Sequence, residues 1–250
     1  MVSYLASWIG RLEEDPTISY AYGTPRKEEI PSEFHFICWN VYKGKRKNFV
    51  EEFQRLIIGN QCDLYALQEA WTGDDLDYGI GQMTSQFLKK GKPSGTFNGS
   101  PVRTQQVQNF RTEIIEPIVG TPKSATLTKY KCKSSTSSES KEITLINFHW
   151  LNWTSDEDWK MELQKILKEI PNSGPLLIAG DFNTSNEWRI NYLQNSLVQE
   201  KGLSLDLKAN YNRKKILDFI FSRDLQVKKT NIITTDASDH PLLSIQYSIL

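Results

Sequence analysis

Cysteine and histidine are scarce in this sequence, and an excess of either charge is absent. Among the 250 residues there are three cysteines, Cys38, Cys62 and Cys132. Their odd number and their spacing fit neither a zinc site nor a disulfide framework. We therefore expect free, buried thiols in a reducing compartment.

Long hydrophobic runs are also missing. No apolar stretch approaches the roughly 18 residues that a membrane helix needs, which excludes a membrane-spanning helix. Residues 1–16 lack the basic start of a signal peptide, so we expect a cytoplasmic protein, although secretion by a signal-less route stays open. The same stretch predicts a short amphipathic helix, part of an arm over 1–33 that packs on the domain, from the spacing of Tyr4, Leu5, Trp8, Ile9 and Leu12.

The charges balance, with 30 Lys and Arg against 30 Asp and Glu. Proteins that bind nucleic acid by bulk attraction usually carry a basic excess. Any phosphate contact must therefore come from a local arrangement of side chains or from a metal ion. The hydrophobic fraction of 38% and the charged fraction of 24% exclude global disorder.

Strands and helices alternate along most of the chain. Hydrophobic patterns predict strands over 34–42, 63–70, 124–130, 142–153, 175–183, 216–222, 227–234 and 241–249. They predict helices over 48–59, 156–170 and 186–201, the second of them capped by Ser155. Residues 72–110 fit two short β-hairpin arms and a loop. Because no repeat or linker divides these elements, we expect a single α/β domain over 1–250 with two packed sheets.

Polar residues interrupt or follow the apolar strands. Each has an ordinary interpretation, as a turn former or a satisfied core residue, and Asn40 and His149 fit it well. Five strands that end in this way indicate one shared site, because buried carboxylates need partners. The residues are Asn40, Glu69, His149, Asp181, Asn183, Asp218, Asp239 and His240.

This set of side chains indicates phosphate chemistry. Oxygen ligands without thiolate select hard cations such as Mg²⁺, Mn²⁺ or Ca²⁺. Hydrolysis of a phosphodiester needs charge neutralisation, a base for water and a donor for the leaving oxygen. Two of the three histidines, His149 and His240, lie among the acids and are candidates for acid–base roles, whereas His35 is expected to be structural or exposed.

The order of these fragments resembles the endonuclease/exonuclease/phosphatase superfamily, and bacterial DNase I-like proteins of unassigned substrate most closely. The fragments are WN (39–40), LQE (67–69), NFH (147–149), GDFN (180–183), LDFIF (217–221) and SDH (238–240). The resemblance implies a four-layer α/β/β/α sandwich with two mixed sheets flanked by helices. It also implies metal-dependent hydrolysis of a phosphate ester.

The resemblance further implies a role for each residue. Asn40 and Glu69 would hold or orient Mg²⁺ or Mn²⁺, with a contribution from Asp239. Asp181 would activate or position the attacking water, and Asn183 would bind the scissile phosphate. His240, paired with Asp218, would bind or protonate phosphate oxygens, and His149 would be a further acid–base candidate.

Two positions depart from the abasic-site repair members of the superfamily. Tyr42 stands where those enzymes often carry an acidic residue. Those enzymes also have a tyrosine before a turn of small residues, whereas the corresponding segment 93–95 contains no tyrosine. Both departures argue against abasic-site repair and leave phosphodiesterase chemistry intact.

We therefore expect a monomeric, divalent-metal-dependent phosphodiesterase or endonuclease, with nucleic acid as the preferred substrate. An inositol phosphate phosphatase, a sphingomyelinase-like phosphodiesterase and a catalytically silent binding module on the same fold stay open. Further contacts to phosphates or bases are open for six residues, each of which also fits a structural role: Arg103, Phe110, Arg111, Lys123, Trp150 and Trp153.

Overall fold

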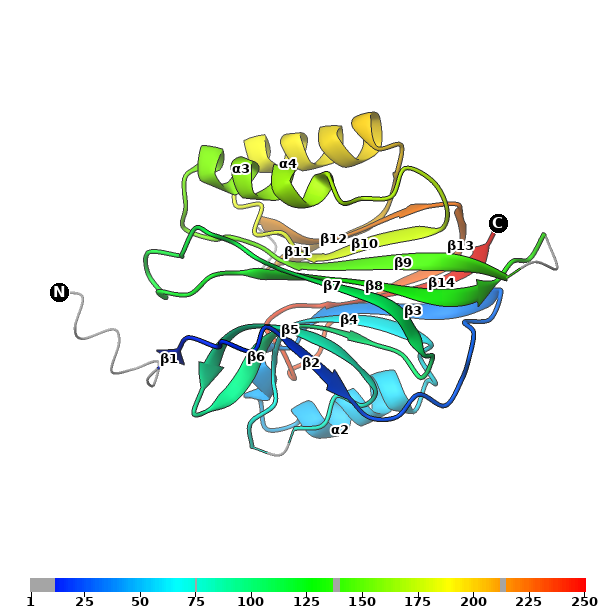
Figure 1. The fold of residues 1–250 in the computed structure, drawn as a ribbon, viewed down its shortest axis with the longest axis horizontal. Helices are drawn as coiled ribbons and strands as arrows, with labels where there is room; N and C mark the ends of the chain where they lie inside the picture. The colour runs from blue at the N-terminus through cyan, green and yellow to red at the C-terminus, as the bar shows by residue number, and fades with distance from the viewer. Residues whose placement is uncertain (1–11, 75, 137–139, 212–214) are drawn as a thin grey trace.

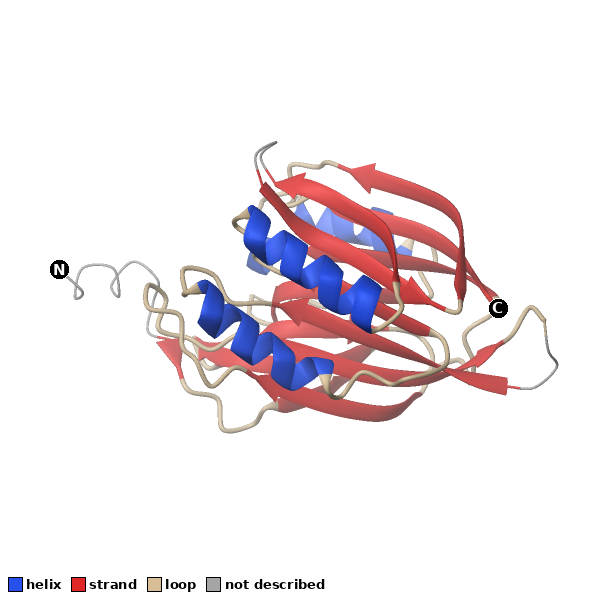
Figure 2. Ribbon diagram, turned by 90° about the horizontal axis from the view of Figure 1, so that it is seen from above, coloured by secondary structure: helices blue, strands red, loops and turns tan. Residues whose placement is uncertain are grey.

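The computed structural model describes residues 12–74, 76–136, 140–211 and 215–250. Two β-sheets lie face to face, and helices cover the outer side of each (Figures 1 and 2). The helix predicted within the first residues lies outside the described part of the chain, apart from Leu12, which opens a short strand.

The first sheet contains eight strands within the described residues. Its two inner strands β4 (Leu64–Trp71) and β3 (Glu33–Asn40) pair in parallel. The order across the sheet is β1, β5, β6, β4, β3, β14 and β13, with β2 paired to β5. The remaining strands are β1 (Leu12–Glu13), β2 (Ser19–Tyr22), β5 (Gly81–Lys89), β6 (Lys92–Gly99), β13 (Leu225–Ile233) and β14 (Leu242–Ile249).

The second sheet contains six strands, counted over the same described ranges, in the order β11, β12, β10, β9, β8 and β7. Only β9 and β10 run parallel, which makes this sheet mixed like the first. The strands are β7 (Thr104–Arg111), β8 (Ser124–Lys133), β9 (Ser140–His149), β10 (Leu176–Asp181), β11 (Ser204–Tyr211) and β12 (Lys215–Arg223).

Helices form the two outer layers. The crossover between β3 and β4 contains α2 (Phe49–Phe53) and the π-helical segment η2 (Gln54–Ile58), which pack on the first sheet. The second sheet is covered by α3 (Asp156–Leu167), α4 (Glu187–Gln194) and the π-helical segment η3 (Asn195–Glu200). Ser155 caps α3 as predicted, since its side chain accepts a hydrogen bond from Asp158 N. The structure therefore confirms the four-layer α/β/β/α sandwich (Figure 1).

The alternation of side chains along β3 shows how the layers form. Phe36 and Cys38 point into the apolar core between the two sheets, whereas Ile37 and Trp39 pack under α2 and η2. One polar contact crosses the core near the site, where Gln68 Nε2 donates to Asn147 Oδ1 over 2.7 Å. Buried polar groups of this kind fix the register of the sheets, because a slip would leave them unsatisfied.

The hairpin region and three strands, β1, β2 and β11, differ from the sequence prediction. Residues 72–110 do not form two short arms: β5 and β6 pair as a long hairpin of the first sheet, while β7 joins the second. The strand β11 was not predicted, although it pairs with β12 along its length.

The remaining expectations concern thiols and membrane helices. All three cysteines, each within a described segment, are free and buried, as predicted. Among the described residues, no helix combines the length and the apolar character needed to cross a membrane.

Candidate active site

Neighbouring strands of the two sheets place the predicted residues at one edge of the sandwich. In the second sheet His149, Asp181 and Asp218 stand side by side, because His149 and Asp218 are the register partners of Asp181. In the first sheet Asn40 ends β3 beside Gln68 of β4. These five strand positions, scattered in sequence, therefore lie at adjacent strand ends.

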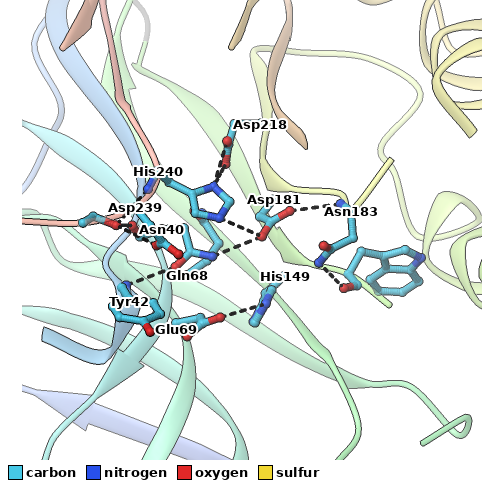
Figure 3. A network of polar contacts seen from close by, with 12 residues as sticks. Asn40, Tyr42, Gln68, Glu69, His149, Asp181, Asn183, Asp218, Asp239 and His240 are labelled. Atoms are coloured by element: carbon cyan, nitrogen blue, oxygen red, sulfur yellow. Dashed lines mark hydrogen bonds and ion pairs between the residues drawn. The ribbon is translucent and has the colours of Figure 1, made fainter. Parts of the chain in front are cut away.

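A chain of polar contacts links the two sheets around Asp181 (Figure 3). His240 Nδ1 lies 2.9 Å from Asp218 Oδ2, and its other ring nitrogen, Nε2, lies 3.8 Å from Asp181 Oδ2. On the opposite side Asn40 Nδ2 donates to Asp181 Oδ2 over 3.1 Å. Asp218 thus fixes the imidazole so that Nε2 points at Asp181 and the cleft.

The carboxylates change the protonation of His240. Burial disfavours the charged ring, but the charge and hydrogen bonds of Asp218, with Asp181 and Asp239, outweigh it and raise the pKa of His240 to about 10. The imidazole is therefore cationic at neutral pH. Burial and the nearby Asp218 carboxylate raise the pKa of Asp181, whereas the His240 cation opposes this shift.

Asn183 is positioned by its own backbone turn after β10. Its N–H donates to Asp181 Oδ1 over 3.0 Å, and its side-chain Nδ2 donates to the carbonyl of Trp150 over 2.8 Å. The residue has a φ of 49°, in the left-handed region that asparagine tolerates better than most residues. The turn directs the Asn183 side chain to the wall of the cleft.

Glu69 occupies an irregularity of β4. The pairing of β4 with β6 shifts register between Leu67 and Ala70, and Glu69 has a φ of 54°. The bulge turns its carboxylate into the cleft, where Lys43 forms an ion pair with it. Burial favours the neutral acid, but the positive charges of Lys43 and nearby Lys123 hold the pKa of Glu69 well below its usual range, so the group is ionised.

His149 has an amide and an ammonium around its ring rather than a carboxylate partner. Gln86 Nε2 lies 3.0 Å from Nδ1 and Lys123 Nζ lies 3.0 Å from Nε2, whereas the Glu69 carboxylate is 3.8 Å away. Burial, and then the positive charge of Lys123, keep the pKa of His149 well below its usual range. His149 is therefore a neutral ring at the cleft wall.

Lys123 reaches this ring from the start of β8. The residue is 8% exposed, and its ammonium lies 3.4 Å from a carboxylate oxygen of the fully buried Glu116. Glu116 in turn accepts a hydrogen bond from the backbone N–H of Asn152 over 2.5 Å. The loop between β7 and β8 is thereby tied to the loop that follows β9.

These groups surround one cleft with a volume of about 720 Å³. Among the described residues, nine non-glycine positions have a positive φ, and five of them line this cleft: Tyr42, Lys43, Glu69, Trp153 and Asn183. Such backbone conformations cost free energy and gather at functional sites. The cleft is therefore the site at which this fold departs most from regular geometry.

The sequence profile of the Endonuclease/Exonuclease/phosphatase family matches residues 37–240 of the chain. The chain belongs to the endonuclease/exonuclease/phosphatase family. A "UPF0294 protein" of Vibrio cholerae is 28% identical over 255 residues, which cover 97% of this chain and 88% of the relative.

Solved structures of the endonuclease/exonuclease/phosphatase family share the fold. A family protein from Leptotrichia buccalis has a TM-score of 0.63 at 16% identity and covers 86% of this chain and 100% of its own. TDP2 of D. rerio, solved with a single-strand DNA product, has a TM-score of 0.54 at 14% identity and covers 87% and 99%.

The residues expected to hold a metal offer two carboxylates, of Glu69 and Asp239, at the wall of the cleft. The amide oxygen of Asn40 lies behind them and accepts a hydrogen bond from Tyr42 N over 3.1 Å. Asn40, Glu69 and Asp239 lie around Tyr42 in Figure 3, and the Glu69 carboxylate is ionised. Within the described ranges no three His, Cys, Asp or Glu side chains form a metal cluster by themselves. Mg²⁺ usually takes one or two carboxylates and keeps several waters, so a carboxylate-and-amide set fits it.

Six of the eight predicted residues line the cleft, and Asn40 and Asp218 support it from behind through Asp181 and His240. Several other candidates lie elsewhere. Arg111 donates to the carbonyls of Ser85 and Asp15, and Arg103 lies at the surface, 3.9 Å from Glu28. His35 is half-buried and shares a hydrogen bond of 2.8 Å with Ser244, as a structural residue would.

The aromatic candidates separate in the same way. Trp150 is 1% exposed and packs in the apolar core under α3. Phe110 is partly buried and packs against the same core. Trp153 is 54% exposed at the wall of the cleft.

Three residues of the site were missed in the sequence: Lys43, Gln86 and Glu116. The lysine-rich segment 43–47 directly after Asn40 was the one available signal for Lys43. Gln86 and Glu116 carry no such signal, because only the folded chain brings β5 and the β7–β8 loop beside His149.

Proposed function

We propose that this protein is a divalent-metal-dependent hydrolase of phosphate esters, acting as a phosphodiesterase or endonuclease. The observation that carries the proposal is the convergence of the cationic His240, the buried Asp181 and the ionised Glu69 at one cleft. A cation, a base and a metal-binding carboxylate are the three groups that phosphodiester hydrolysis needs.

Each side chain has a role that its contacts support. Asp181 accepts the proton of the attacking water, because its carboxylate faces the cleft and is held by Asn40 and Asn183. His240 binds a phosphate oxygen through Nε2 and protonates the leaving oxygen, while Asp218 keeps Nδ1 occupied and the ring cationic. Asn183 orients the phosphate from the wall of the cleft.

The metal would be held by Glu69 and Asn40, with a contribution from Asp239. When bound, Mg²⁺ or Mn²⁺ would supply neutralisation of the negative charge that builds on the phosphate. The ion pair between Lys43 and Glu69 keeps a positive charge beside this carboxylate.

Nucleic acid is the preferred substrate because lysines gather on one wall of the cleft. Lys43 and Lys45 follow β3, and Lys89 ends β5. These lysines lie close enough for their charges to repel one another, and burial together with this repulsion lowers the pKa of both Lys45 and Lys89. A molecule of zero net charge therefore presents a local positive surface beside the site. D. rerio TDP2, which shares the fold and was solved with a single-strand DNA product, offers a parallel for such a substrate.

Hydrolysis assays with purified protein test the proposal. Plasmid DNA, bis-p-nitrophenyl phosphate, an inositol phosphate and sphingomyelin vesicles are each incubated with Mg²⁺, Mn²⁺ or EDTA. We expect cleavage of the first two with metal and none with EDTA, and the Asp181→Asn variant serves as the inactive control. If only the inositol phosphate or only sphingomyelin is turned over, that compound class and not nucleic acid is the substrate. If no compound is turned over with any metal, the protein is a silent binding module on this fold.

A further inference from the structure

Lys123 is the one buried lysine that faces the cleft from the second sheet among the described residues. Its positive charge lowers the pKa of both Asp181 and Glu69. Neither a solvated lysine nor an ordinary surface ion pair would sit 8% exposed among these groups.

The contacts of this ammonium leave part of it available. A lysine has three N–H donors, and those of Lys123 face His149 Nε2 at 3.0 Å and Glu116 Oε2 at 3.4 Å. No third acceptor is found within the segments that the structure describes. The contact with Glu116 is longer than a tight charge-assisted hydrogen bond, which spans about 2.7–2.9 Å. Glu116 therefore orients the Lys123 ammonium without using its full capacity to donate hydrogen bonds.

A purely structural role explains this arrangement poorly. Burying a lysine and a glutamate costs several kcal/mol of desolvation per ion, and an apolar pair of similar size would join the two loops at least as well. A buried ammonium at the wall of a phosphate-binding cleft instead serves a ligand that brings its own negative charge.

The hydrogen bonds of His149 place it behind Lys123. Because Lys123 can only donate, Nε2 of His149 must be the acceptor, and the ring proton lies on Nδ1. The Gln86 amide, 3.0 Å from Nδ1, then accepts the ring proton through its oxygen, since the amide orientation follows from the hydrogen-bond network. Both ring nitrogens are thus occupied by protein groups, and His149 has no nitrogen left for substrate.

We propose that Lys123 binds a non-bridging oxygen of the scissile phosphate from the second sheet, with Glu116 and His149 as the residues that position its ammonium. This inference rests on the proposed function and deepens it. It adds Lys123 to His240 as a cation that binds the phosphate, and it makes His149 a positioning residue instead of an acid or base.

Two substrates of different size show whether Lys123 binds the scissile phosphate or a phosphate farther along the chain. Bis-p-nitrophenyl phosphate contains the scissile phosphate and no other, whereas plasmid DNA contains many. For Lys123→Met we expect kcat/KM to fall by about a hundredfold or more on both substrates, the scale for removing one donor to a developing oxyanion. The matched control is Lys131→Met, an exposed lysine on the same strand, which should leave both rates unchanged.

Two further variants keep the test open if Lys123→Met leaves Glu116 as an unpaired buried charge and unfolds. The double variant Lys123→Met/Glu116→Gln removes both charges and should fold, as thermal melting would show, yet remain equally slow. His149→Gln should lose clearly less activity than Lys123→Met. A loss confined to plasmid DNA, a near-normal rate for the folded double variant, or a larger loss in His149→Gln would each overturn the proposal.

Equilibrium binding of inorganic phosphate in EDTA distinguishes failure of this inference from failure of the proposed function. The wild-type protein should bind phosphate calorimetrically, and the folded Lys123 variants should bind it at least about tenfold more weakly, with Lys131→Met unchanged. This result is expected even if no ester is turned over. Equal phosphate affinity in the wild type and the Lys123 variants, or no phosphate binding by the wild type, would contradict the role of Lys123.

Discussion

Single side chains of this site acquire their chemistry from one or two neighbours. His240 is cationic because Asp218 lies 2.9 Å behind it, and His149 is neutral because it is buried and Lys123 lies 3.0 Å from it. Two histidines of one cleft therefore have opposite protonation states. The sequence predicted that both belong to the site, but their different states depend on partners that only the fold brings close.

The acid–base pair gives the first prediction. His240→Gln and Asp181→Asn should each lower the rate of phosphodiester hydrolysis by at least about a hundredfold, the scale of general acid–base groups. The third histidine provides the matched control, since His35 contacts Ser244 on β14 and does not line the cleft. A rate within a few-fold of wild type in either active-site variant, with His35→Gln also active, would show that the assignment is wrong.

The partnership of Asp218 and His240 can be tested without any substrate. In Asp218→Asn the imidazole keeps a hydrogen-bonding partner but loses its nearest negative charge. Burial then weighs more heavily, and the pKa of His240 should fall from about 10 by about 2 pH units, within the range for loss of an adjacent opposite charge. NMR titration of the His240 ring in metal-free protein measures this change, and an unaltered midpoint would exclude Asp218 as its cause.

At the scale of strands and helices, regular elements were predictable and irregular ones were not. The crossover from β3 through α2 to β4, and the helix capped by Ser155, followed from hydrophobic periodicity. The strand β6 begins with Lys92 and Pro93 and includes Gly95, so its propensity opposes a strand that pairing with β4 and β5 nevertheless stabilises. The bulge at Glu69 has no sequence signal at all, although it directs the carboxylate into the cleft.

One glycine controls the close approach of two strands at the site. Gly180 of β10 has a φ of 142°, and a Cβ atom there would lie 2.0 Å from the carbonyl oxygen of Phe148 on β9. We expect Gly180→Ala to lower the free energy of unfolding by about 3 kcal/mol or more, from the clash and the backbone strain together. Chemical denaturation of the variant measures this loss.

The matched control for that variant is Gly202→Ala. Gly202 also has a positive φ, 68°, but nothing lies within 4 Å of an added Cβ atom. Its loss should be about 1 kcal/mol, from the backbone conformation alone. Equal losses at the two positions would mean that the contact with β9 does not constrain β10.

For the molecule as a whole, overall charge proved a poor guide to local charge. The sequence has zero net charge, yet the fold brings the lysine-rich segments 43–47 and 89–92 together beside the cleft. Lys89 and Lys90 both lie over the ring of Trp71, with Nζ 4.5 Å and 5.9 Å from its centroid. No property of either segment alone predicts that they meet, because one follows β3 and the other joins β5 to β6.

This lysine wall gives a prediction that depends on salt. Binding of plasmid DNA in EDTA should weaken in Lys45→Ala/Lys89→Ala, and the slope of log affinity against log salt should become shallower by about 1.8, or 0.9 for each lost phosphate contact. Filter binding over a range of salt concentrations measures the slope. The control pair Lys228→Ala/Lys229→Ala on the exposed strand β13 should leave it unchanged, and an equal effect of both pairs would refute a directed surface.

The division of the site between the sheets has a consequence for the newly made chain. Asn40 and Glu69 belong to one sheet and Asp181 to the other, and His240 stands directly before β14, whose pairing with β3 joins residues about two hundred positions apart. During synthesis, the earlier strands emerge from the ribosome before this imidazole does. Under the proposed function, the nascent polypeptide would therefore acquire its complete site only when β14 has docked on β3.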